Sequence, residues 1–211
     1  MRITKFGHSC LLVEENNERI LVDPGVWSVL PDSLSAVQAI LLTHEHPDHI
    51  DPNLLHAVLA KSPEATIYTN KAVGKKLDAE KINYTTIHPE QSFFVGEVTI
   101  AVIGEKHAVI YPELPEISNT GYLINNRLFV TGDALTVPGR PVEILALPVC
   151  APWSKIIEVI DYAKKVLPKM AFPVHDGMLK ITTGFHKWPE TFLPPAGIKW
   201  QVINDGQTID V

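Results

Sequence analysis

The stretch LLTHEHPDHID, Leu41–Asp51, places three histidines and an aspartate within six positions, directly after an apolar run. These four residues are His44, His46, Asp48 and His49. Polar groups at the end of a buried strand are unfavourable unless they have partners or face a cavity. A divalent metal ion satisfies several such groups at once, and imidazole nitrogen and carboxylate oxygen suit zinc, manganese or iron. The stretch therefore predicts a metal site.

The spacing within the stretch allows more than one ion. The first two histidines are two positions apart and can project the same way from an extended segment. The Asp-His pair follows Pro47, where the chain turns, and can face a second point nearby. A polar loop with incidental histidines is the structural alternative. It would be preferred for one histidine, but not for H-x-H-x-D-H after an apolar strand.

Two ions need more ligands than this stretch supplies, and three further residues stand at the ends of separate apolar runs. His107 follows VTIAVIGEK, Asp133 follows RLFVTG and His175 follows MAFPV. Strand ends meet at one rim of a sheet, where active sites are commonly assembled from several elements. A lone buried histidine is usually a hydrogen-bonded core residue, so the set is persuasive only when taken together.

The composition limits the class of protein. The 211 residues are 45% hydrophobic and 20% charged, which predicts one globular domain spanning residues 1–211. The net charge of −6 argues against nucleic acid as a partner, because that usually requires a basic surface. Two cysteines give no disulfide framework, and we see no signal peptide or membrane span. We expect a cytoplasmic protein with a small-molecule substrate, no membrane association and an undetermined oligomeric state.

Strand-like runs dominate the chain, with helices between some of them. Asp51 and Pro52 are typical of a helix start, and Asn70 can cap a second helix. The spacing of apolar residues predicts a third helix from Trp153 to about Leu167. We expect a final hairpin of IKWQVI and QTIDV, and an aromatic, proline-rich loop over Gly184–Pro195. Sheets with helices on their outer faces bury such a chain well, which indicates an α/β (α+β) fold.

The ordered set of seven residues resembles the complete dinuclear signature of the metallo-β-lactamase fold superfamily. This resemblance covers nearly the whole chain and implies a four-layer αβ/βα sandwich of two mixed β-sheets, with the metals at one edge of the sheets. It implies that His44, His46 and His107 hold one metal ion. Asp48, His49 and His175 would hold the second, and Asp133 would bridge both.

The details of the signature separate branches of this superfamily. An aspartate at position 133 argues against β-lactam hydrolysis, and EKHAV at the third histidine differs from the PGHT of glyoxalase-II-like thioester hydrolases. The opening FGHSCLLVE resembles that of small proteins related to ascorbate-6-phosphate lactonase, and also the N-acyl phospholipid hydrolases, which share a GH(S/A) start. We therefore expect a hydrolase of a small anionic ester, lactone or phosphodiester.

Two metal ions can bridge a hydroxide and polarise a substrate oxygen, so we expect a metal-bridging hydroxide as the nucleophile. The expected cofactors are two divalent ions, with zinc first and manganese or iron as alternatives. Asp48 is the expected catalytic residue, because it is both a ligand and able to hold or receive the proton. Asp23 and Asp176 could fix histidine tautomers, although Asp176 could equally be a surface residue. Cys150 is not expected to be a nucleophile.

Three residues are candidates for substrate binding, and two other functions stay open. The candidates are His8, Tyr111 and His186. His8 could instead be a turn residue satisfied by backbone, and the role of His186 is open. The alternative functions are a nuclease or phosphodiesterase of the same fold, which the acidic balance disfavours, and a catalytically idle metal-binding scaffold, which a complete ligand set disfavours.

Overall fold

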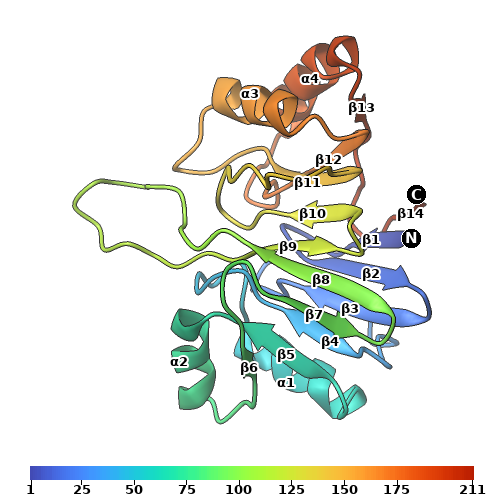
Figure 1. Cartoon of the computed structure of the whole chain (residues 1–211), viewed down its shortest axis with the longest axis vertical. Coiled ribbons are helices and arrows are strands. Elements are labelled where there is room, and N and C mark those ends of the chain that lie inside the picture. Colours follow the sequence, from blue (N-terminus) through green and yellow to red (C-terminus); the bar gives the residue numbers. More distant parts are fainter.

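The computed structural model describes residues 1–211 and consists of two seven-stranded β-sheets with helices on their outer faces (Figure 1). In spatial order, the first sheet contains β14 (Thr208–Asp210), β1 (Arg2–Lys5), β2 (Leu11–Glu15), β3 (Glu18–Val22), β4 (Ala39–Leu41), β5 (Thr66–Thr69) and β6 (Thr85–Thr86). The second contains β13 (Lys199–Trp200), β12 (Met170–Val174), β11 (Ile144–Pro148), β10 (Leu128–Val130), β9 (Gly121–Ile124), β8 (Val98–Ile103) and β7 (Ser92–Val95).

Antiparallel and parallel pairing both occur in each sheet. In the first sheet β1, β2 and β3 run antiparallel, whereas β3, β4, β5 and β6 are parallel. In the second sheet β7 to β10 are antiparallel, and β10 to β13 are parallel. The predicted pair of mixed sheets is therefore confirmed.

Alternating side chains along the strands build three hydrophobic cores and hence four layers. In β3, Ile20 and Val22 enter the core between the two sheets, while Leu21 points to the outer core. In β11, Ala146 faces the core between the sheets and Leu145 the opposite outer core. This period of two is what a strand buried on both faces requires.

Helices close the two outer cores. α1 (Pro52–Lys61) and α2 (Lys71–Ala79) cover the first sheet, and α3 (Ile156–Val166) and α4 (Thr183–Phe192) cover the second (Figure 1). The predicted caps are present, because the side chain of Asp51 accepts from the amide of Asn53, and that of Asn70 from the amides of Ala72 and Val73. The short 3₁₀ helix η1 (Pro194–Ala196) follows α4.

Three local expectations are wrong. The third helix begins at Ile156, so Trp153 lies in the loop before it. The segment expected as a loop over Gly184–Pro195 is mostly helix α4, which contains Pro189. The final two strands form no hairpin, since β13 pairs with β12 in one sheet and β14 with β1 in the other.

The segments that carry the predicted metal ligands follow strands and meet at one edge of the sandwich. His44 to His49 lie between β4 and α1, and His107 lies in the long loop after β8. Asp133 follows β10, and His175 directly follows β12. None of the helices is both long and apolar enough to cross a membrane.

Candidate metal centre

The fold brings the seven predicted ligands together, and an eighth residue, His8, joins them. Within each of two groups of four, one nitrogen or carboxylate oxygen atom per residue lies within 4.8 Å of the others. The first group is His44, His46, His107 and Asp133, and the second is His8, Asp48, His49 and His175. Apart from His8, and from Asp133, which the resemblance assigns to both ions, this division matches the one that the family resemblance implies.

Asp133 belongs to the first group by distance but also contacts the second. Its Oδ2 atom lies 3.5 Å from His107 Nε2 and 2.9 Å from His175 Nε2, and its Oδ1 atom lies 3.1 Å from His49 Nε2. Its side chain is only 4% exposed. The carboxylate is therefore placed to serve both groups.

Four of the histidine rings are oriented by acceptors at Nδ1. His49 Nδ1 donates to Asp23 Oδ2 at 2.8 Å, and His107 and His175 Nδ1 each face a backbone carbonyl. His44 Nδ1 lies 3.0 Å from Thr43 Oγ1, whose own proton goes to Asp23. With a proton fixed on Nδ1, the Nε2 atom is the one left to hold a proton or a metal ion.

Several buried nitrogen and oxygen atoms of the centre have no hydrogen-bonding partner, as is expected of atoms that bind a metal ion. Nε2 of His8, His49, His107 and His175 and Oδ1 of Asp133 are buried without a hydrogen-bonding partner. Their close approaches to one another are not aligned as hydrogen bonds, and buried polar atoms are rarely left in this state. Imidazole nitrogens converging with carboxylate oxygens are a donor set that fits zinc, manganese or iron.

Asp23 orients the histidines of the centre through its contacts with Thr43 and His49. The residue is fully buried and directly follows β3, with a left-handed φ of 46°. Its carboxylate accepts from the amide and hydroxyl of Thr43, at 2.8 and 2.7 Å, and from His49 Nδ1. The structure thus places Asp23 where the sequence predicted a residue that fixes a histidine tautomer.

Burial and neighbouring charges shift the pKa values of the centre in opposite directions. Burial lowers the pKa of His44 well below its ordinary value and that of His8 to about 4. Burial also disfavours the charged forms of His49 and His175, but the Asp133 carboxylate outweighs it. The pKa of His49 is therefore raised well above its ordinary value, and that of His175 to about 9.

Comparison with known proteins identifies the fold family. The profile of the β-lactamase superfamily domain matches residues 2–175 of the sequence. The chain belongs to the metallo-β-lactamase superfamily. Protein Rv0786c of Mycobacterium tuberculosis is 40% identical over 184 residues, which cover 85% of each chain.

A further relative and a solved structure agree with this assignment. A UPF0173 metal-dependent hydrolase of Carboxydothermus hydrogenoformans is 25% identical over 208 residues, or 90% of this chain and 86% of its own. The crystal structure of a metallo-β-lactamase fold protein from Bacillus subtilis superimposes with a TM-score of 0.75 at 17% identity, covering 99% and 98% of the two chains. The protein is a metal-dependent hydrolase of the metallo-β-lactamase fold.

The three residues predicted to bind substrate lie in different parts of the structure. Tyr111 is exposed and lines, together with His107, a cavity of about 500 Å³ formed by the long loop between β8 and β9. His186 lies on α4, with Nε2 2.9 Å from Asp176 Oδ2. His8 is fully buried beside Asp48.

Asp176 and Cys150 support the segment around His175. Asp176 is buried, which contradicts the surface alternative, and it also pairs with the buried Lys5 Nζ at 2.6 Å. The backbone carbonyl of Cys150 accepts from His175 Nδ1, so this residue contributes its main chain. Burial raises the pKa of the Cys150 thiol, which disfavours a thiolate nucleophile.

Sequence reasoning missed three residues that hold the centre. The indole Nε1 of Trp153 donates to Asp133 Oδ2 at 3.0 Å, and Asn119 Oδ1 accepts from the Asp133 amide at the same distance. Thr43 links Asp23 to His44. Thr43 could have been noticed, because it stands between the apolar run and the first histidine. Trp153 and Asn119 are far from the motif in sequence and carry no local signal.

Proposed function

We propose that the protein is a dinuclear metal-dependent hydrolase. His44, His46 and His107 hold one ion, and Asp48, His49 and His175 hold the other. Asp133 is shared between them. The observation that carries the proposal is the position of Asp133, whose two carboxylate oxygens face histidine Nε2 atoms of both groups.

The chemistry of the proposed reaction divides between the ions and the protein. When bound, two divalent ions supply a water of lowered pKa and polarise the oxygen of the scissile bond. Asp48 would accept a hydrogen bond from that water and so hold its proton. In the metal-free protein burial opposes its charged form, but hydrogen bonding with the neighbouring His175 and His8 keeps its pKa well below the ordinary value. It is therefore a carboxylate at neutral pH and able to accept a hydrogen bond.

We propose zinc as the native metal, because a site dominated by imidazole nitrogen suits it, with manganese or iron accepted by the same donors. The two unpaired cysteines fit a reducing compartment such as the cytoplasm. A nuclease is disfavoured by the net charge of −6. An idle scaffold is disfavoured by the similarity to proteins named metal-dependent hydrolases.

The proposed substrate is a small ester, lactone or phosphodiester. The loaded centre would carry a net positive charge, because two divalent cations are held by only two carboxylates, Asp48 and Asp133. This charge would attract an anionic group on the substrate. The cavity next to His107 has an apolar side, formed by Val109, Ile110 and Leu114, that can take up the rest of the molecule. Tyr111 lines the same cavity and supplies a polar hydroxyl.

The experiment is a hydrolysis assay of lactones, phosphodiesters, carboxylic esters and thioesters with zinc-loaded and manganese-loaded protein. Asp133→Asn keeps the size of the side chain and removes its charge, so we expect a loss of at least about 100-fold in kcat/KM. Asp32→Asn is the matched control on a fully exposed carboxylate and should leave the rate unchanged. Hydrolysis that is equal in the Asp133→Asn variant and the unaltered protein would overturn the proposal.

A further inference from the structure

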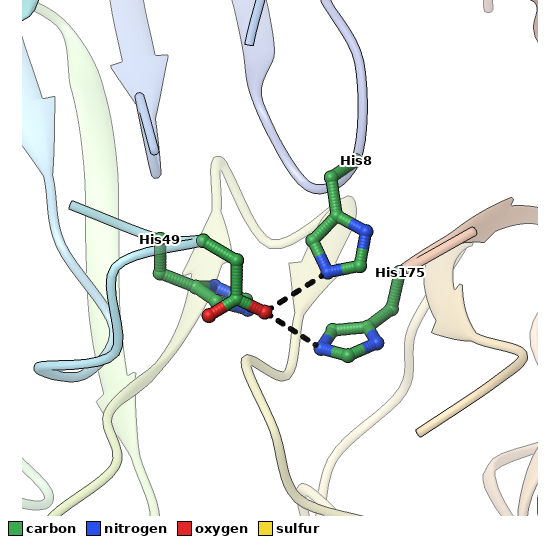
Figure 2. Close-up of side chains that lie close together, drawn as sticks. His8, His49 and His175 are labelled. Atoms are coloured by element: carbon green, nitrogen blue, oxygen red, sulfur yellow. Dashed lines mark ion pairs between the residues drawn. The ribbon is translucent and has the colours of Figure 1, made fainter. Parts of the chain in front are cut away.

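His8 is the one member of the second group that the metal-ligand signature does not account for. It lies in the turn between β1 and β2 and is fully buried. Figure 2 shows its ring beside those of His49 and His175, at centroid distances of 5.8 and 4.0 Å. By distance alone it could be a further protein ligand.

The hydrogen bond at Nδ1 decides which atom of the His8 ring faces the centre. The backbone amide of Gly177 donates to His8 Nδ1 at 3.1 Å. An amide nitrogen can only donate, so Nδ1 must present its lone pair and cannot carry the ring proton. The proton is therefore on Nε2, and a protonated nitrogen cannot bind a metal ion.

This pattern is the reverse of that in four of the proposed ligands. In those rings Nδ1 faces an oxygen acceptor, and Nε2 is the nitrogen that remains for the metal ion. The four rings are those of His44, His49, His107 and His175. The same environment thus contains rings that present a lone pair and one ring that presents an N–H group.

The His8 N–H faces the carboxylate of Asp48. Nε2 of His8 lies 3.2 Å from Asp48 Oδ2, which is also 3.5 Å from His175 Nε2; dashed lines mark these two pairs at the rings of His8 and His175 in Figure 2. Asp48 Oδ2 is within reach of this N–H group but is not aligned with it as a hydrogen bond, so the buried donor has no partner. A buried donor left in this state is unfavourable, and a small rotation of the Asp48 carboxylate would satisfy it. A carboxylate oxygen has two acceptor positions, so Asp48 Oδ2 can accept a hydrogen bond from His8 and still face the metal site.

The main chain of His8 is tied to the second group as well. Its carbonyl accepts from the amide of His175 at 2.8 Å. A Cβ atom on Gly177 would lie 2.9 Å from His8 Cβ, so this contact requires a glycine. The turn that carries His8 therefore connects Asp48, from the first sheet, with His175, from the second.

We propose that His8 is a positioning residue and not a metal ligand. Its imidazole is neutral, with the proton fixed on Nε2, and donates to Asp48 so that the carboxylate keeps its orientation in the second group. This replaces the expected substrate contact. The inference rests on the proposed function for the role of Asp48 as a ligand.

The first test reads the tautomer directly. Protein labelled with ¹⁵N-histidine is loaded with zinc, and long-range ¹H–¹⁵N correlation spectra identify which nitrogen of each ring carries a proton. We expect His8 to be the Nε2–H tautomer, with and without zinc, and His49, His107 and His175 to carry the proton on Nδ1. A His8 ring protonated on Nδ1 in the zinc-loaded protein would overturn the proposal.

The second test uses variants, with zinc affinity as the readout. His8→Gln keeps an N–H donor, whereas His8→Leu removes it. We expect the second zinc ion to bind about 10–100-fold more weakly to the leucine variant and within about 3-fold of normal to the glutamine variant. His56→Gln, on an exposed histidine of α1, is the matched control. Equal losses in the Gln and Leu variants would contradict the donor role.

The outcomes separate this inference from the proposed function. If the unaltered protein binds a single ion, the dinuclear proposal fails, but the His8 tautomer can still be read in the metal-free protein. If the leucine variant does not fold, the spectra of the unaltered protein still decide the question.

Discussion

The indole of Trp153 donates a hydrogen bond from Nε1 to Oδ2 of Asp133 at 3.0 Å. Its ring also lies edge-on to His107 and His175, at centroid distances of 6.0 and 6.3 Å. A residue just before α3 therefore restrains the carboxylate that contacts both groups of the centre. Partners of this kind orient metal ligands and raise their affinity for the metal.

Replacing Trp153 by Phe keeps an aromatic ring and removes the donor. We expect Trp153→Phe to weaken zinc binding by about 10–100-fold, because the Asp133 carboxylate loses its restraint. Competition with a chromophoric chelator measures the affinity. The control is Trp188→Phe, on a half-exposed ring of α4. An unchanged zinc affinity in Trp153→Phe would show that the hydrogen bond does not support the centre.

The buried carboxylate of Asp23 is predicted to be important for stability as well as for the metal. Asp23→Asn loses the charge that faces His49 and Thr43, so we expect the free energy of unfolding to fall by about 3 kcal/mol. Urea unfolding of the metal-free protein measures this change. Asp32→Asn, on an exposed loop, should change it by less than about 0.5 kcal/mol. Similar values for the two variants would refute the structural role of Asp23.

Gly25 allows the metal-binding loop to approach β3 closely. A Cβ atom at this position would lie 1.9 Å from the carbonyl oxygen of Asp48 and 2.5 Å from the amide nitrogen of His49. Gly25→Ala must therefore displace the loop, and we expect a loss of stability of about 3 kcal/mol or more together with weaker zinc binding.

The matched control for that variant is Gly184→Ala in α4, where an added Cβ meets no atom within 4 Å. Alanine is the better helix former, so this variant should be neutral or more stable by up to about 1 kcal/mol. Thermal unfolding and zinc titration of both variants test the prediction. It fails if Gly25→Ala binds zinc as tightly as Gly184→Ala.

The raised pKa of His175 predicts that metal ions compete with protons. In the metal-free protein its pKa of about 9 keeps the ring charged at pH 7. Zinc binding must displace that proton, so affinity should rise as the pH increases toward 9 and fall as it decreases below 7. Titration calorimetry in buffers of different ionisation enthalpy measures the protons released. Identical heats in all buffers would contradict the prediction.

Local patterns predicted sheets flanked by helices and a rim where the seven residues meet, whereas the four layers and the division into two groups came from the family resemblance. Apolar runs such as AILL identify buried strands, and polar residues directly after them must lie at the strand ends. Which strands pair with each other, in contrast, is not determined by the nearby sequence. The turn near Gly206 is real, but β14 pairs with β1 across the chain, through Ile209 opposite Ile3, and not with β13.

Long-range packing also explains α4 and the role of Trp153. Gly184 and Pro189 disfavour a helix, yet α4 forms, and Phe185 together with Leu193 just after the helix packs against the outer core of the second sheet. Trp153 looked like the first apolar residue of a helix, and only the folded chain shows that its indole contacts Asp133. The His8 tautomer likewise depends on Gly177, 169 positions away.

Metal content measured by inductively coupled plasma mass spectrometry tests the dinuclear centre most directly. After zinc loading and gel filtration, we expect two ions per chain in the unaltered protein and in the exposed-site control His56→Ala. His175→Ala should retain about one ion, because it removes a ligand of the second group only. One ion or fewer in the unaltered protein, with no change in His175→Ala, would contradict the dinuclear assignment.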